Sequence, residues 1–210
     1  MNQFVPREGG ALAGRTVAIM LESDYVEPEL HYYQRRFAEE GATVRYVTRL
    51  WGNESLTFTG HEYHLPFTVD SDVDELDDRR LAELDVLIVP SGMVADRLRY
   101  TEDATRLAPA VRLLRRAFDR PSVLKGIICH GMWLVSPIAE VVRGRRVTAH
   151  VNLLADVRNM GAVYTDQDVV VDRDLVTARS ADHCHLFART IIDLVTARTA
   201  SRFRRLRSHP

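Results

Sequence analysis

Short apolar runs alternate with amphipathic stretches along this chain. Runs of buried-strand length lie at 16–21 (TVAIML), 43–48 (TVRYVT), 85–92 (DVLIVPSG) and 123–129 (VLKGIIC). Between these runs, apolar residues recur at helical spacing and predict two helices. The first begins near Glu27, with Pro28 in its first turn, and ends at a glycine cap at Gly41; the second lies within 103–118. Continuous apolar strands separated by helices predict an α/β sandwich, in which helices cover both faces of a mostly parallel central sheet.

The remaining segments fit the same scheme. In residues 56–70, apolar and polar positions alternate around a turn, which predicts a short β excursion. Residues 131–142 follow the last buried strand and are predicted to form a helix. Two short strands at 168–172 and 175–179 predict a hairpin with its turn at Arg173 and Asp174. A final helix is expected over 184–198.

Composition narrows the class of protein. The 210 residues are 46% hydrophobic and 27% charged with a net charge of −1, which is ordinary for one globular domain and gives no reason to expect nucleic acid as a partner. No apolar run approaches the roughly 20 residues that cross a bilayer, and the N-terminus lacks the apolar core of a signal peptide. We expect a flexible arm over 1–14, one domain over 15–198, a basic tail over 199–210, and a cytoplasmic location with two reduced cysteines.

Cys129 ends an apolar strand and is followed by His130 and Gly131. This is the layout of a nucleophile elbow, in which a tight strand-to-helix turn presents a reactive side chain. A helix N-terminus stabilises a thiolate, so we expect the pKa of this thiol to be lowered. The alternative is a buried cysteine that packs as a small hydrophobic residue.

The chain resembles the ThiJ/PfpI superfamily, and most closely its PfpI branch. The similarity lies in the opening strand followed by DYVEPEL, and then in DVLIVPSG, GIICHGMW, VRGRRVTAH and NMGAVYTDQDVVVDRDLVTARS, in family order over roughly residues 15–197. This superfamily shares the flavodoxin-like core of the class I glutamine amidotransferases. The resemblance therefore implies a flavodoxin-like sandwich, which agrees with the mostly parallel, helix-covered sheet that the hydrophobic pattern predicts.

The resemblance also implies roles for particular residues. Cys129 would be the nucleophile, and its own amide or that of His130 would form the oxyanion site together with the backbone of Gly92 and Met93. Asp96 would reach His130 from a neighbouring subunit, which implies a homodimer or a higher homo-oligomer. A pocket histidine near the nucleophile would correspond to His150, a second candidate acid/base.

One position departs from the family pattern. The family places a glutamate that hydrogen-bonds the thiol at the position where this chain has Val26. Glu27 would serve instead if the turn is shifted by one residue, with Glu22 or Asp24 as weaker candidates. Otherwise His130 or His150 does the proton transfer without a carboxyl group, or the chemistry has been lost or replaced.

The HCH stretch, residues 183–185, has two readings. Two histidines around a cysteine do not define a zinc site without further ligands, whereas a capped helix start explains the stretch without a metal. We therefore expect no metal and no cofactor. The resemblance places the loop before this helix beside the cysteine, so His183 is a candidate pocket residue.

Together these features predict an enzyme that uses Cys129 to attack an electrophilic carbon of a small molecule. The resemblance implies an amide hydrolase, a glyoxalase III or deglycase-like enzyme, or an isonitrile hydratase-like enzyme. The alternative is a non-catalytic redox sensor or ligand-binding protein, which Val26 favours. In neither case do we expect nucleic acid or a membrane as a partner.

Overall fold

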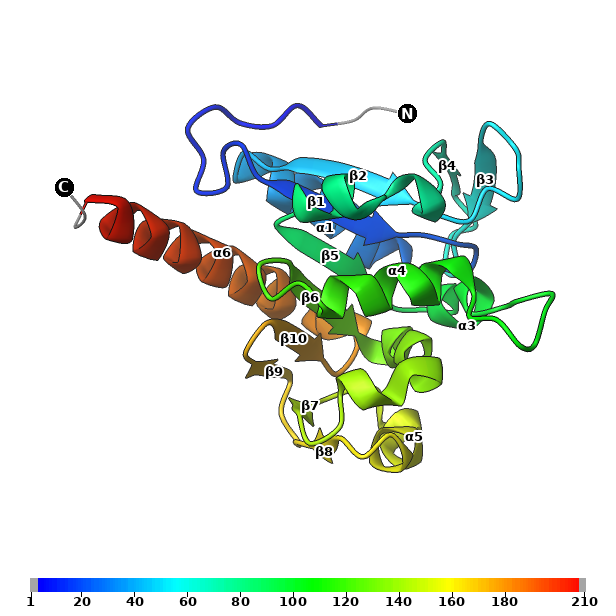
Figure 1. Ribbon diagram of the computed structural model, residues 1–210. Coiled ribbons are helices and arrows are strands. Elements are labelled where there is room, and N and C mark those ends of the chain that lie inside the picture. The colour runs from blue at the N-terminus through cyan, green and yellow to red at the C-terminus, as the bar shows by residue number, and fades with distance from the viewer. Residues whose placement is uncertain (1–3, 208–210) are drawn as a thin grey trace.

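The computed structural model of the chain describes residues 4–207. Its central sheet has six strands in the order β2-β1-β5-β6-β10-β9, of which the first five run parallel and β9 pairs antiparallel with β10 (Figure 1). These strands are β1 (Thr16–Met20), β2 (Thr43–Val47), β5 (Val86–Val89), β6 (Leu124–Ile128), β9 (Val169–Asp172) and β10 (Leu175–Ala178).

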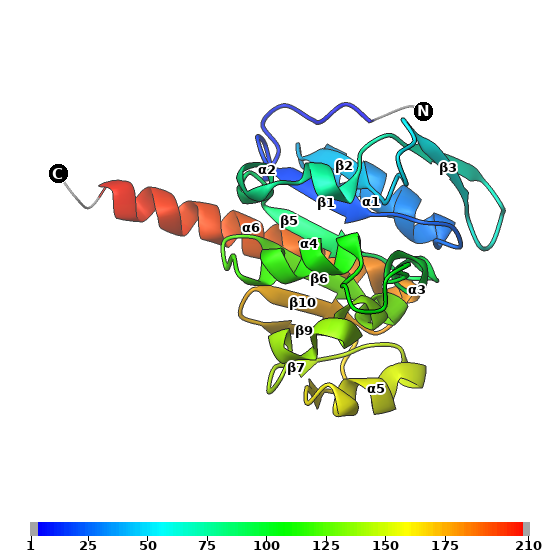
Figure 2. The same cartoon turned by 45° about the vertical axis from the view of Figure 1, so that its right-hand side comes forward.

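Helices cover both faces of this sheet. Figures 1 and 2 show α1 (Glu27–Glu39) and α6 (Cys184–Arg207) on one face and α4 (Pro109–Phe118) on the other. The remaining helices are α2 (Asp78–Ala82), α3 (Val94–Leu98), α5 (Leu154–Asn159) and the 3₁₀ helices η1 (Val73–Glu75), η2 (Cys129–Val141), η3 (Val151–Leu153) and η4 (Ala181–His183). The predicted flavodoxin-like sandwich is confirmed. In the described part of the chain, no helix combines the length and apolar character needed to cross a membrane.

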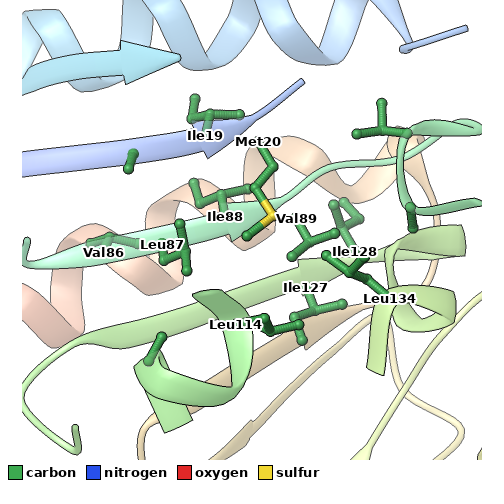
Figure 3. Close-up of a cluster of buried hydrophobic side chains, with 14 of the residues drawn as sticks. Ile19, Met20, Val86, Leu87, Ile88, Val89, Leu114, Ile127, Ile128 and Leu134 are labelled. Atoms are coloured by element: carbon green, nitrogen blue, oxygen red, sulfur yellow. The ribbon is translucent and has the colours of Figure 1, made fainter. Parts of the chain in front are cut away.

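Two small sheets lie outside the central one. The expected excursion after β2 is the antiparallel hairpin of β3 (Leu56–Thr59) and β4 (Pro66–Val69), and a parallel pair joins β7 (Arg146–Val147) to β8 (Val163–Tyr164). The core follows from the continuous apolar strands that the sequence showed. Figure 3 shows Ile19 and Met20 of β1, Ile88 of β5, Ile127 of β6 and Leu114 of α4 among the buried side chains of this core.

Three boundaries differ from the prediction. The helix expected over 103–118 begins only at Pro109, because Asp103 instead closes a local turn by accepting bonds from Thr105. The segment after Cys129 is a 3₁₀ helix rather than an α-helix, with Pro137 beside a kink at Ile138. The last helix continues to Arg207 instead of ending at 198, so the described part of the basic tail is helical.

The described part of the N-terminal arm packs on the domain. Leu12 is fully buried, and the backbone amides of Arg7 and Leu12 donate to the carbonyls of Ala38 and Glu40 at the end of α1. Residues 1–3 of the predicted arm and 208–210 of the predicted tail lie outside the described residues. Arg7 and Leu12 thus attach this segment to the end of α1.

Candidate active site

Cys129 sits directly after β6, at the carboxyl edge of the sheet. Its backbone adopts a φ of +58°, which is rare for a residue other than glycine, and its side chain is largely buried. Two residues later, a Cβ on Gly131 would lie 2.8 Å from the Val89 carbonyl oxygen and 3.1 Å from that of Pro90. Only glycine therefore lets the elbow pack this closely against the end of β5. The expected tight turn at the cysteine is present.

The thiol is surrounded by groups from several elements. His130 Nδ1 lies 3.2 Å from Cys129 Sγ. Burial raises the pKa of the thiol to about 11, and the nearby Glu29 carboxyl raises it too, whereas the backbone N–H groups of His130 and Ala181 and the Ser91 hydroxyl lower it. The expectation of a lowered thiol pKa is therefore wrong. The helix that follows is an irregular 3₁₀ segment, and burial outweighs the N–H groups that face the sulfur.

Glu29 supplies the carboxyl group of the site, which the sequence reasoning missed. It lies in the first turn of α1, is 1% exposed, and accepts a hydrogen bond from the Ser91 backbone N–H at 3.1 Å. Burial raises the pKa of Glu29 to about 7. A buried acid with a pKa near neutrality is suited to accept and return a proton. In the sequence, Glu29 is the second glutamate of the EPE stretch, and the sequence prediction chose the first, Glu27.

Glu27, the predicted replacement for the family glutamate, serves the β3–β4 connection instead. Its carboxylate accepts backbone hydrogen bonds from Glu62 at 2.8 Å and Tyr63 at 2.9 Å. Burial opposes its ionisation, but the bonds from Glu62 and Tyr63 outweigh burial and lower the pKa of Glu27 to about 2. Glu27 is therefore an ionised structural anchor. Val26 is the N-cap residue of α1 and contributes no side-chain capping bond.

His130 is stacked between two rings. Its ring centroid lies 4.6 Å from that of His150, with 26° between the planes, and 4.8 Å from that of Trp133. Burial, followed by the charge of His150, lowers the pKa of His130, so the imidazole is neutral near pH 7 and able to accept a proton. His150 Nδ1 accepts the Asn152 backbone N–H at 3.3 Å. The structure thus places His130 beside Cys129 and stacks His150 on His130.

The turn after β5 holds the predicted oxyanion residues. Gly92 has a φ of +79°, and a Cβ there would lie 2.1 Å from the Asp24 carbonyl oxygen. The Met93 N–H donates to that same carbonyl at 3.1 Å, so it is already occupied. The Gly92 amide is therefore the remaining candidate oxyanion donor from this turn. The second candidate donor is the His130 amide, which faces the sulfur.

Asp96 and His183 lie at different places around the elbow. Asp96, on α3, forms an ion pair with Arg99 at 3.0 Å, and its side chain is 42% exposed, so it is available to a second subunit. His183 is held at both ring nitrogens, by Ser180 Oγ at 2.9 Å and Asp168 Oδ1 at 3.3 Å. It lies two residues after Ala181, whose N–H faces the thiol. Among the described residues, no three metal-ligating side chains are grouped to hold an ion.

Fold and site together define an α/β protein with a buried cysteine at a strand-to-helix elbow. Residues 15–194 match the DJ-1/PfpI family, and the chain belongs to that family. This confirms the resemblance seen in the sequence.

Named relatives and solved structures agree with this assignment. The chain is 31% identical over 188 residues to "Protein/nucleic acid deglycase 2" of Escherichia coli (strain K12), covering 87% of this chain and 99% of that protein. It is 28% identical over 180 residues to "Deglycase PfpI" of Pyrococcus furiosus, covering 85% and 98%. A ThiJ/PfpI domain protein from Brachyspira murdochii shares the fold with a TM-score of 0.73 at 17% identity, covering 88% of this chain and 98% of that one.

Proposed function

We propose that this protein is a cysteine-dependent enzyme of deglycase type, acting on the electrophilic carbon of a small carbonyl compound or of its adduct with a thiol or amine. The observation that carries the proposal is the Cys129 thiol at the elbow, 3.2 Å from a neutral histidine and close to a buried carboxyl group. The names of the relatives support the deglycase type over an amide hydrolase or an isonitrile hydratase.

The chemistry begins at the thiol. Cys129 Sγ attacks the carbonyl carbon and forms a carbon–sulfur bond, while the thiol proton passes to a neighbouring acceptor. The electron pair of the carbonyl bond moves to oxygen, and the amides of His130 and Gly92 would donate to the resulting oxyanion. His130, through Nδ1, is one such acceptor. Because the thiol is protonated at rest, loss of its proton must accompany the attack.

A second subunit belongs to this proposal. Asp96 of one subunit would hydrogen-bond His130 of another and fix its orientation, which makes the active form a homodimer or a higher homo-oligomer. The exposure of Asp96 and its position on a short helix beside the elbow support this arrangement. The two free cysteines support a reducing compartment such as the cytoplasm.

The redox-sensor alternative loses its main support. It rested on the absence of a carboxyl group at Val26, whereas Glu29 places one near the thiol from the same helix start. A thiol with a raised pKa is also a poor target for peroxide near pH 7, because the thiolate is the reactive form.

The test uses the adduct of methylglyoxal with N-acetylcysteine. Hydrolysis of this hemithioacetal consumes one water and yields lactate and the free thiol, both of which can be quantified. We expect turnover by the native chain and a loss of at least about 100-fold in Cys129→Ser, with Cys184→Ser as the matched control that keeps activity. Equal turnover by the native chain and Cys129→Ser, or no turnover of carbonyl adducts at all, would refute the proposal.

A further inference from the structure

The Gly92 amide, the candidate oxyanion donor after β5, depends on its neighbours for its direction. Glycine has no side chain to restrict its backbone, and Gly92 adopts a φ of +79°. The segment that leads into this turn lies against the elbow, because a Cβ on Gly131 would lie 2.8 Å from the Val89 carbonyl oxygen and 3.1 Å from that of Pro90. The contacts that hold this turn therefore also set how the Gly92 N–H is presented.

Asp24, in the turn after β1, contacts the Gly92 turn through its backbone. Its carbonyl oxygen accepts the Met93 N–H at 3.1 Å and would lie 2.1 Å from a Cβ on Gly92. Its own N–H donates to the Thr59 carbonyl oxygen at 2.7 Å, at the end of β3. Asp24 has a φ of +60°, a left-handed conformation that aspartate adopts more readily than most residues. Its peptide groups thus join the Gly92 turn to the β3–β4 hairpin.

The Asp24 carboxylate is held by Arg97 of α3. Arg97 Nε donates to Asp24 Oδ2 at 3.1 Å, and its Nη2 donates to the same oxygen. The Arg97 backbone N–H donates to the Met93 carbonyl oxygen at 3.1 Å. These bonds close a ring in which Met93 binds the Asp24 backbone, the Asp24 side chain binds Arg97, and Arg97 binds Met93. We call this ring the Asp24–Arg97 clamp.

The clamp contributes more to geometry than to stability. The side chains of Arg97 and Asp24 are 46% and 35% exposed, and an ion pair open to solvent adds little to the free energy of unfolding. An oxyanion donor, in contrast, is effective only when its N–H is held within hydrogen-bond distance of the atom where the charge develops. A small displacement of the turn is therefore enough to weaken that bond.

We propose that Asp24 and Arg97 are positioning residues that hold the Gly92 N–H toward the carbonyl oxygen attacked by Cys129. The inference deepens the proposed function and rests on it. Neither residue needs to contact the substrate, because both act through the Met93 peptide groups that follow Gly92. Asp24, a weaker sequence candidate for the missing carboxyl group, thus acts through the oxyanion turn.

The first test measures kcat and KM for the methylglyoxal adduct of N-acetylcysteine. Four chains are compared: native, Arg97→Met, Asp24→Asn and the double variant. Asparagine keeps the side-chain size and tolerates the left-handed backbone, but it removes the charge. Arg112→Met is the matched control, because Arg112 forms a similarly exposed ion pair with Asp74 at 3.0 Å and lies on α4, away from both turns.

We expect each single variant to lower kcat about tenfold and to change KM by less than about threefold, because an oxyanion contact strengthens only in the transition state. The double variant should fall no more than about threefold below the single variants, since either substitution already opens the ring. Arg112→Met should retain native kcat. Thermal unfolding and light scattering establish that each variant keeps the native fold and subunit number. A raised KM with unchanged kcat would overturn the proposal, because Arg97 would then bind substrate directly.

The second test needs no substrate and follows hydrogen exchange of the Met93 amide by NMR. Because this amide donates to the Asp24 carbonyl oxygen, Arg97→Met should accelerate its exchange about tenfold, whereas Arg112→Met should not. Unchanged exchange in Arg97→Met overturns the clamp, and faster exchange with native kcat overturns its role in positioning. An absence of turnover by the native chain refutes the proposed function instead, and Met93 exchange then still decides whether the ion pair holds the turn.

Discussion

Glu29 gives a quantitative test of the site's electrostatics through the substitution Glu29→Gln. The pKa of this carboxyl group rises from its ordinary value of 4.5 to about 7 in the folded protein, chiefly because the group is buried. The folded state therefore holds the proton more tightly than the unfolded state. Glu29 does not destabilise the fold below pH 4.5, but its ionisation lowers stability as the pH rises from 4.5 to about 7.

The size of the effect follows from linkage. At about 1.4 kcal/mol per pKa unit, the rise lowers the free energy of unfolding by about 3 kcal/mol above about pH 7. Glutamine resembles the neutral acid in shape, and its side-chain oxygen can still accept the Ser91 N–H. Glu29→Gln should therefore be close to the native chain in stability near about pH 4.5, and more stable than it by about 3 kcal/mol near about pH 8.

Urea unfolding of both chains across this pH range measures the difference directly. Glu27→Gln is the matched control, because it lies two residues away on the same helix turn and its pKa is shifted in the opposite direction. It should destabilise the protein at neutral pH, and that loss should shrink as the pH falls below 4.5. A stability difference between Glu29→Gln and the native chain that does not change with pH would refute the reasoning.

Two further predictions concern the elbow and the subunit interface. Gly131→Ala places a Cβ 2.8 Å from the Val89 carbonyl oxygen and should lower the free energy of unfolding by about 1–3 kcal/mol in urea titrations; native-like stability would show that the two turns separate easily. Asp96→Ala should reduce turnover of the carbonyl adduct by about tenfold or more with little change in unfolding, because the Asp96 side chain is only partly buried within one subunit. Full activity of that variant, or a monomer by light scattering, would rule out the shared site.

The fold could be predicted because its strongest signals are local. The continuous apolar runs that became β1, β5 and β6 are buried on both sides, and the helices between them show clear periodicity. The irregular segment after Cys129 could not be predicted in the same way. Its residues have helical spacing, but Pro137 and the kink at Ile138 turn it into a 3₁₀ helix, and this removes the strong helix terminus that we expected at the thiol.

The site was predictable in part for a related reason. Cys129 and His130 stand in a recognisable order, whereas the choice between Glu27 and Glu29 depends on the phase of a helix. Residues two apart on a helix point about 200° apart, so only one of the two can face the elbow. The sequence does not show which of the two faces the elbow, because both lie at the start of the same predicted helix and the rotation of that helix is set by its packing.

The raised pKa of Cys129 has a consequence for selectivity. With a pKa of about 11, only about one molecule in ten thousand carries the thiolate near pH 7. General electrophiles and oxidants therefore find almost no reactive sulfur in the resting protein, although the residue is poised for attack once a carbonyl compound is bound. Labelling surveys that detect cysteines by their spontaneous reactivity should overlook this one. A covalent inhibitor should instead carry a carbonyl group that the amides and proton acceptors of the elbow can engage.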